Sequence, residues 1–175
     1  NRWKNLTWRD VTGGASYTWT DENKGYRFSN AVNPSTAQNH MAPTERLEEI
    51  PALNRHYVEK IQALCESHGA KFLLMSMPST VNWNTAKHNG IHQLSRELGC
   101  EYVDLNLEND RLHIDWNRDT RDKGDHLNYF GAVKVTRFLS SYLRDTGMLT
   151  DRRNNPYFPS WNRSLEKYET LVSAV

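Results

Sequence analysis

Between residues 51 and 146, helical and strand-like patterns alternate along the chain, joined by linkers of only a few residues. Apolar side chains recur at near-helical spacing in residues 51–69, 86–98 and 128–146. Two short apolar runs, residues 71–77 and 101–106, lie between these helices and are typical of strands in a parallel sheet. This order predicts an α/β fold in which helices flank a parallel sheet through right-handed crossovers.

Local signals mark where the predicted helices begin and end. Pro51 suits a first helical turn, and Gly69 and Gly99 follow the first two helices. Asn128 can cap the third helix, and Ser160 can cap a last one. We expect the apolar residues of this last helix to dock it on the domain; the alternative is a helix that binds a partner. Four apolar residues mark one face of the first helix: Leu53, Tyr57, Ile61 and Leu64.

The length of 175 residues, with 37% hydrophobic residues, suits one globular domain over the whole chain. We expect three parts within it: an irregular segment at 1–43, the α/β portion at 44–150 and a helical extension at 151–175. Cys65 and Cys100 fit no metal-binding spacing. We therefore expect both to be buried free thiols.

Charge and hydropathy argue against several classes of partner. Lys and Arg number 22 against 21 Asp and Glu, so the net charge of +1 indicates neither nucleic acid nor an anionic membrane. No apolar run approaches the roughly 18–20 residues of a membrane span. No glycine-rich strand-to-helix loop is present, so we expect no nucleotide and no other cofactor. The chain begins at Asn1, and we expect it to be processed, trimmed or partial.

The stretch from residue 122 to 132 carries the strongest chemical signal. His126 lies on a charged loop just before a predicted helix, with Asp125 one residue and Asp122 four residues behind it. A carboxylate can hold an imidazole so that its second nitrogen acts as a base near neutral pH. The alternative is a solvated loop in which these residues only cap the helix and form salt bridges.

Two glycines frame this loop. We predict that Gly124 permits a turn with positive φ before His126, and that Gly131 lets the first turn of the helix approach a neighbouring loop closely. His113 and Asp115 are near His126 in sequence, but their spacing matches no common zinc pattern. We therefore expect no metal site.

The letters Asp-His-Leu-Asn-x-x-Gly-Ala-x-Lys-x-Thr, at residues 125–136, resemble the final motif block of the SGNH (GDSL-like) hydrolases and acyltransferases. This resemblance implies a flavodoxin-like three-layer sandwich and a Ser-His-Asp triad in which His126 is the general base. The family places its Asp three residues before the His, where this chain has Lys123. We prefer Asp122, because a turn one residue wider can still bring it to the imidazole. Asp125, next to His126, stays open.

The SGNH family takes its nucleophilic Ser, and the Gly and Asn of its oxyanion hole, from earlier blocks that we do not find here. The resemblance covers about residues 1–150 and corresponds to the later half of the family's domain, without its N-terminal strands. We therefore expect the C-terminal portion of a longer SGNH-like protein, or a chain completed by another. Residues 2–6 and 24–26 resemble secreted or membrane-anchored bacterial members, which implies an extracytoplasmic or cell-envelope location.

Two hypotheses about function follow. The first is a Ser-dependent ester hydrolase or O-acyltransferase acting on an acylated small molecule or carbohydrate, where the carbohydrate preference rests on the resemblance. The second is a non-catalytic glycan- or protein-binding module whose loop is structural. A serine nucleophile upstream in the parent gene would favour the first hypothesis.

Loops that follow parallel strands meet at the carboxyl edge of the sheet, where ligands bind. We expect residues 78–84, the segment after Asn106 and the His126 loop to share this rim. Asn82 and Trp83 are expected to line an acyl or sugar pocket; the alternative for Trp83 is packing over the sheet end. Asn128 is also counted among the substrate-binding residues.

Three serines are candidates for the nucleophile. Ser76 and Ser79 lie near a predicted strand end, and Ser16 ends the sequence Gly13-Gly14-Ala15-Ser16. None has the strand and glycine pattern that holds a serine on a sharp elbow. We therefore prefer a serine outside this chain.

Overall fold

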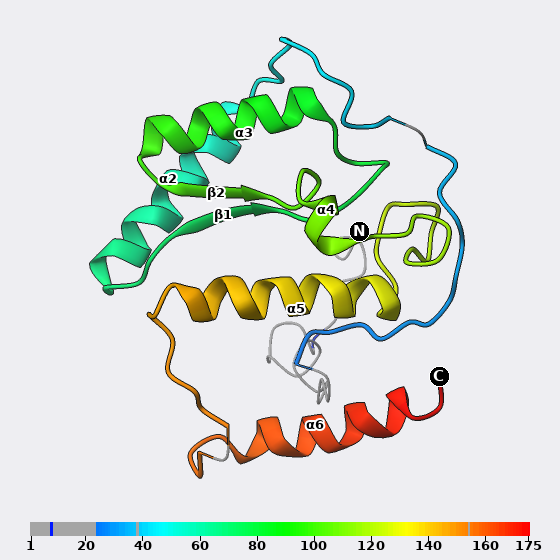
Figure 1. Ribbon diagram of the computed structural model, residues 1–175. Coiled ribbons are helices and arrows are strands. Elements are labelled where there is room, and N and C mark those ends of the chain that lie inside the picture. Colours follow the sequence, from blue (N-terminus) through cyan, green and yellow to red (C-terminus); the bar gives the residue numbers. More distant parts are fainter. Residues whose placement is uncertain (1–7, 9–23, 38, 154) are drawn as a thin grey trace. The chain divides into compact units, whose positions relative to one another are not determined.

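The computed structural model describes Trp8 and residues 24–37, 39–153 and 155–175. Figure 1 shows their helices and strands, which are α2 (Ala52–Ser67), β1 (Leu73–Ser76), α3 (Thr85–Leu98), β2 (Glu101–Asp104), α4 (Asn109–Leu112), α5 (Tyr129–Asp145) and α6 (Pro159–Val172). The chain divides into two compact units. The larger unit is Ser29–Leu149, and the smaller one includes residues 24–28 and Thr150–Val175.

The two strands form a small parallel sheet in the larger unit. Leu73 pairs with Glu101 at one end, and Ser76 pairs with Asp104 at the other. Helix α3 connects the strands and lies on one face of the sheet, whereas α5 lies on the opposite face (Figure 1). The prediction of a mixed α/β fold with parallel strands is therefore confirmed.

The core of the larger unit fills the space between the sheet and α5. Its buried apolar side chains are Leu105, Leu112, Ile114, Val135 and Phe138. Met75 and Val103, from the two strands, pack against this cluster and are partly buried. Helix α4, which supplies Leu112, was not predicted from the sequence, because four residues are too few to show a helical period.

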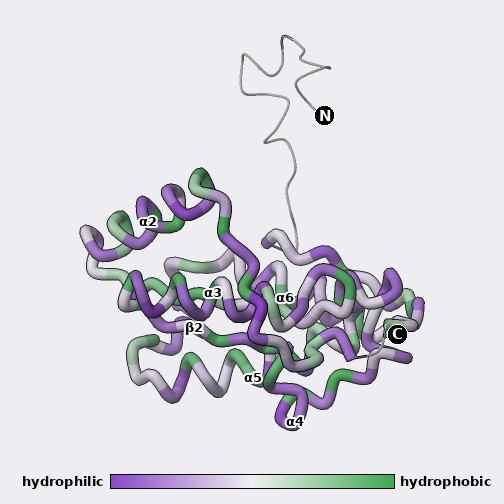
Figure 2. The backbone as a smooth tube through the Cα atoms, turned by 90° about the horizontal axis from the view of Figure 1, so that it is seen from above, coloured by the Kyte–Doolittle hydropathy of each residue, from purple (hydrophilic) through white to green (hydrophobic). Residues whose placement is uncertain are grey.

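Helix α2 buries none of its side chains. Its predicted apolar face is exposed, with fractions of 64% for Leu53, 56% for Tyr57, 50% for Ile61 and 61% for Leu64. Figure 2 shows hydrophobic and hydrophilic positions interleaved along this helix. Polar contacts join it to α3: Arg55 donates to Glu97, and Gln62 Nε2 donates to the Leu98 carbonyl at 3.0 Å.

Residues 29–37 run past the loop that carries His126 without forming a helix or strand. Main-chain hydrogen bonds hold them there, from Asn33 N to the Thr120 carbonyl and from Ser35 N to the Trp116 carbonyl, both at 2.9 Å. A segment far away in sequence is therefore part of the surroundings of His126.

In the smaller unit, α6 packs on residues 24–28 through aromatic rings. The Tyr168 ring meets Tyr26 edge-on, with centroids 5.9 Å apart, and meets Phe28 in the same way at 6.3 Å. Tyr168 therefore packs this helix on residues 24–28 of the same unit, whereas its docking on the α/β portion of the chain stays a prediction. In contrast, Trp161 and Leu165 remain 58% and 54% exposed.

Two local predictions are wrong. Helix α6 starts at Pro159, with Phe158 at the N-cap, so Ser160 lies inside the helix and does not cap it. Proline suits this first position because its fixed φ is already helical. Cys65 and Cys100 are free but only partly buried, and Cys65 lies on α2, which buries none of its side chains.

Candidate active site around His126

Asn128 lies between the loop that carries His126 and helix α5. Its Oδ1 accepts a hydrogen bond from Gly131 N at 3.3 Å, which is the expected cap. Its Nδ2 donates to the carbonyls of Arg118 (2.7 Å) and Ala31 (3.0 Å), and the residue is only 2% exposed. The amide is therefore used inside the protein, so we assign Asn128 to fixing the loop. A Cβ on Gly131 would lie 2.6 Å from the Asp119 carbonyl, which confirms the predicted close approach.

The hydroxyl of Thr120 ties the two ends of the His126 turn together. It accepts a hydrogen bond from Gly124 N at 2.7 Å and donates one to the His126 carbonyl at 3.1 Å. Gly124 has a φ of +96°, which confirms the predicted turn, and Lys123 before it has a φ of +64°. These two left-handed residues widen the turn so that Asp122 reaches back to His126.

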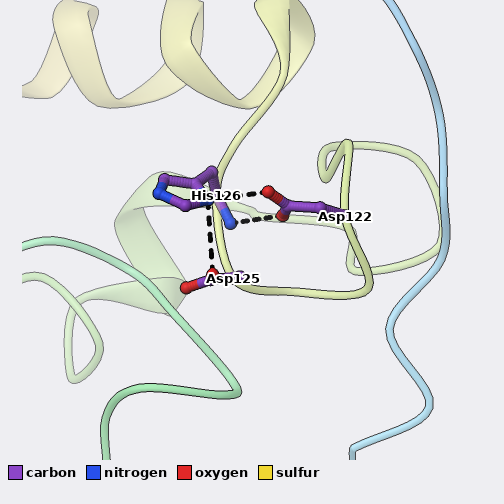
Figure 3. A group of neighbouring side chains, drawn as sticks. All are labelled: Asp122, Asp125 and His126. Carbon is purple, nitrogen blue, oxygen red and sulfur yellow. Dashed lines mark hydrogen bonds and ion pairs between the residues drawn. The ribbon is translucent and has the colours of Figure 1, made fainter. Parts of the chain in front are cut away.

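Asp122 holds His126 through two of its atoms, as Figure 3 shows. Its Oδ1 accepts from the His126 main-chain N–H at 2.6 Å, and its Oδ2 lies 2.7 Å from Nδ1. An ionised carboxylate only accepts, so Nδ1 carries the proton and Nε2 of the neutral ring keeps its lone pair. The second ring nitrogen points away from both carboxylates (Figure 3). Asp125 Oδ2 lies 3.5 Å from Nδ1, so Asp122 is the closer partner.

The charges around Asp122 keep it ionised. Burial raises the pKa of Asp122, but the hydrogen bonds from His126, the charge that the imidazole carries when protonated and the charge of Arg121 outweigh it, so the pKa lies below its ordinary value of 3.8. The His126 side chain is 56% exposed and that of Asp122 is 39% exposed. The imidazole is therefore both oriented by a carboxylate and open to solvent.

Hydroxyl groups from two distant segments support the turn at Gly124. The Gly124 carbonyl accepts from Thr80 N at 2.9 Å and from Ser79 Oγ at 3.2 Å. Ser35 Oγ lies 2.6 Å from Thr80 Oγ1, so residues 29–37 are tied to the same place. The sequence did not single out Ser35 or Thr80, because contacts between distant segments leave no periodic signal.

Asn82 and Trp83, the two predicted pocket residues, reach different partners. Asn82 is exposed, and its Nδ2 donates to Asp125 Oδ1 beside His126. Trp83 Nε1 donates to Asp104 Oδ2 at 2.8 Å, so its indole lies over the carboxyl end of β2. The structure thus brings Asn82 to the His126 site, whereas the contact of Trp83 corresponds to packing over the sheet end.

Asp104 lies at the carboxyl end of the sheet, is 6% exposed, and binds several side chains through its carboxylate. Besides the indole, its Oδ2 accepts from the Tyr102 hydroxyl at 3.1 Å and lies 2.8 Å from His88 Nδ1. Its Oδ1 accepts from Asn106 N (2.9 Å) and Nδ2 (2.8 Å), and Asn106 Oδ1 accepts from Ser79 N at 2.9 Å. The ends of both strands are therefore linked to the loop that supports Gly124.

No described serine side chain forms a hydrogen bond with the His126 imidazole. Ser76 is 6% exposed, and its Oγ lies 2.9 Å from the Tyr102 hydroxyl. Ser79 is 8% exposed and donates to the Gly124 carbonyl. Residues 13–16, with the third candidate serine, lie outside the described residues.

The site also offers metal-binding groups. Asp122, Asp125 and His126 each present a ligand atom, and these atoms lie within 4.8 Å of one another. Carboxylate oxygen and imidazole nitrogen are ligands that Zn²⁺ accepts, and three protein ligands are typical of its catalytic sites. The absence of a metal site therefore stays a prediction.

The chain matches no family model, no curated protein and no solved structure. Across the part of the chain that the structure describes, no helix combines the length and the apolar character needed to cross a membrane. The geometry around His126 is therefore the basis for a functional proposal.

Proposed function

We propose that this chain supplies the His–Asp base of a Ser-His-Asp ester hydrolase or O-acyltransferase of the SGNH type, acting on an acylated small molecule or carbohydrate. The observation that carries the proposal is the pair of Asp122 and His126, in which Nδ1 is held at 2.7 Å on a ring that is largely exposed. His126 would take the proton of the serine hydroxyl during attack on the ester carbonyl and return it to the leaving alcohol. Asp122 would fix the tautomer and stabilise the imidazolium.

The position of this pair supports the role. Hydrogen bonds connect Ser79 after β1, Asn106 after β2 and the turn at Gly124. The carboxyl ends of parallel strands are where such sheets bind ligands. The proposal includes an SGNH three-layer sandwich whose remaining strands lie outside this chain, and an extracytoplasmic or cell-envelope location.

The nucleophilic serine would come from outside these 175 residues, either upstream in the same polypeptide or from another one. The support for this point is that Ser76 and Ser79 are buried and bonded elsewhere. The chain by itself should then turn over no aryl acetate at an appreciable rate. A protein that includes the preceding part should do so, and its rate should fall in acid, where a protonated imidazole can no longer accept the proton of the serine.

The experiment compares variants of that longer protein in aryl acetate hydrolysis. His126→Ala should lower kcat by about 10⁴-fold or more, and Asp122→Asn by about 10⁴-fold. Asp125→Asn should retain most activity, as should the control His113→Ala, which removes an exposed histidine elsewhere. An active protein indifferent to His126→Ala would refute the proposal. A large loss with Asp125→Asn and none with Asp122→Asn would reassign the orienting carboxylate.

A second candidate function is a non-catalytic glycan- or protein-binding module. Two observations favour it: no described serine bonds to His126, and the ligand atoms of Asp122, Asp125 and His126 lie within 4.8 Å of one another. A structural metal would then hold the loop. Under this alternative the longer protein is inactive on esters, and calorimetry detects Zn²⁺ binding that Asp125→Ala abolishes.

A further inference from the structure

A cavity of about 470 Å³ lies in the smaller unit, beside the first turns of α6. We call it the α6 groove, and its lining residues are Arg152, Arg153, Phe158, Trp161, Asn162 and Leu165. Its composition combines an apolar wall with guanidinium groups and one amide. Small-molecule sites in proteins commonly have this composition.

The apolar wall of the α6 groove is exposed. Trp161 is 58% exposed, Leu165 54% and Phe158 41%. Tyr168, further along the same helix, is packed edge-on against Tyr26, which holds the helix in place. The groove therefore presents partly exposed aromatic and aliphatic surface to a ligand.

The charge at the groove is positive. Among the described residues no carboxylate pairs with Arg152, whereas Arg153 forms an ion pair with Asp151 at 2.5 Å. Lys24 Nζ lies 5.5 Å from the centre of the Trp161 ring and adds a third cation. Among the described residues, two arginines line the groove and only one of them, Arg153, has a carboxylate partner, so charge complementarity favours an anionic occupant.

We propose that the α6 groove binds a carboxylated sugar ring of an acidic polysaccharide. The apolar face of a pyranose ring would lie on Trp161, and the Asn162 amide can donate to and accept from ring hydroxyls. The carboxylate would meet the planar fork of Arg152, which suits bidentate binding. This site lies in the smaller unit and is independent of the chemistry at His126.

Other anions match the groove less well. Nucleic acid binding needs several phosphate contacts, and a chain of net charge +1 with one unpaired arginine in the groove does not supply them. An acidic peptide would satisfy the arginine but has no flat saturated ring for the indole. A neutral glycan would stack on Trp161 but would leave the cations without a partner.

The test is a calorimetric titration of the whole chain with a galacturonic acid oligosaccharide, with a neutral glucose oligosaccharide of equal length as the reference. We expect binding of the acidic sugar only, accompanied by a shift of the Trp161 indole signal in NMR spectra. Trp161→Ala and Arg152→Gln should each weaken binding by about tenfold. Circular dichroism shows whether each variant is folded.

Two controls match these changes in residue type. Tyr157→Ala removes an aromatic ring that is 87% exposed, and Arg163→Gln removes an exposed charge of α6; neither residue lines the groove. Both should leave binding unchanged. Equal binding of the neutral sugar, of oligoglutamate or of a mononucleotide would overturn the proposal, as would a folded Trp161→Ala variant that binds normally. Because the titration involves no ester turnover, this proposal and that for His126 can fail separately.

Discussion

Gly124 is the position where one added methyl group should disturb the loop that carries His126 most. Its φ is +96°, and a Cβ there would overlap Thr80 Oγ1 and lie 2.6 Å from Ser35 Oγ. Gly124→Ala therefore adds backbone strain of about 1–2 kcal/mol and overpacking of about 1–3 kcal/mol. We expect the free energy of unfolding to fall by about 2–5 kcal/mol.

Gly99→Ala is the matched control. Gly99 also has a positive φ, +64°, but no atom lies within 4 Å of its Cβ position. Gly99→Ala should lower the free energy of unfolding only by the backbone strain, about 1–2 kcal/mol. Urea unfolding followed by far-ultraviolet circular dichroism measures both variants. If Gly124→Ala costs no more than Gly99→Ala, the described packing of Ser35 and Thr80 against the turn is wrong.

A second measurement follows the site itself. The His126 main-chain N–H donates to Asp122 across the turn that contains Gly124. In Gly124→Ala we expect this amide to lose protection from hydrogen exchange, whereas Gly99→Ala should leave it unchanged. Adding Thr80→Ala to Gly124→Ala should cost less than the two single changes together, because the overlapping hydroxyl is removed.

Three further predictions concern the buried network and the pH dependence. Asp104→Asn should lower the free energy of unfolding, measured in urea, by about 3 kcal/mol or more, because the N–H groups of the new amide would face N–H and O–H donors. The control Asp145→Asn, at a side chain that is 71% exposed, should change this free energy little. Asp122 has a lowered pKa in the folded protein, so its stabilisation is present above pH 3.8 and is lost as the pH falls through the folded value. The stability difference between wild type and Asp122→Asn should therefore shrink in acid, and a difference independent of pH would contradict the ion pair. Thr120→Val removes the acceptor of the buried Gly124 N–H and should lower the free energy of unfolding by about 1–3 kcal/mol, with faster exchange of the Gly124 amide. The His126 carbonyl keeps its hydrogen bond from Arg121 N at 3.2 Å. An unchanged exchange rate would contradict the hydrogen bond between Gly124 and Thr120.

The sequence by itself determined the elements whose signals span only a few residues. Helix α3 and strand β2 lie where the apolar spacing predicted them, and Gly99 ends α3 in a left-handed conformation as its position indicated. Asn128 caps α5, and Gly124 adopts a positive φ. Each of these outcomes depends on the residue itself and on neighbours within one or two turns, so it can be read without knowing the rest of the chain.

Periodicity predicted the apolar face of α2 but not its surroundings. Leu53 and Leu64 share that face and remain more than half exposed, because no other described element covers it. Helix α4 is too short to show a period, and contacts such as those of Tyr168 with Tyr26 and Phe28 join segments about 140 residues apart, which no local pattern predicts.

Only the tertiary structure decided how His126 is held. The motif spacing left Asp122 and Asp125 open, and the choice depends on two successive left-handed residues, Lys123 and Gly124, that turn Asp122 back to Nδ1. That turn is fixed by hydroxyls and carbonyls from segments up to about ninety residues away, such as Ser35. Hydrogen bonds of this kind form between groups that only folding brings together, so no local sequence pattern predicts them.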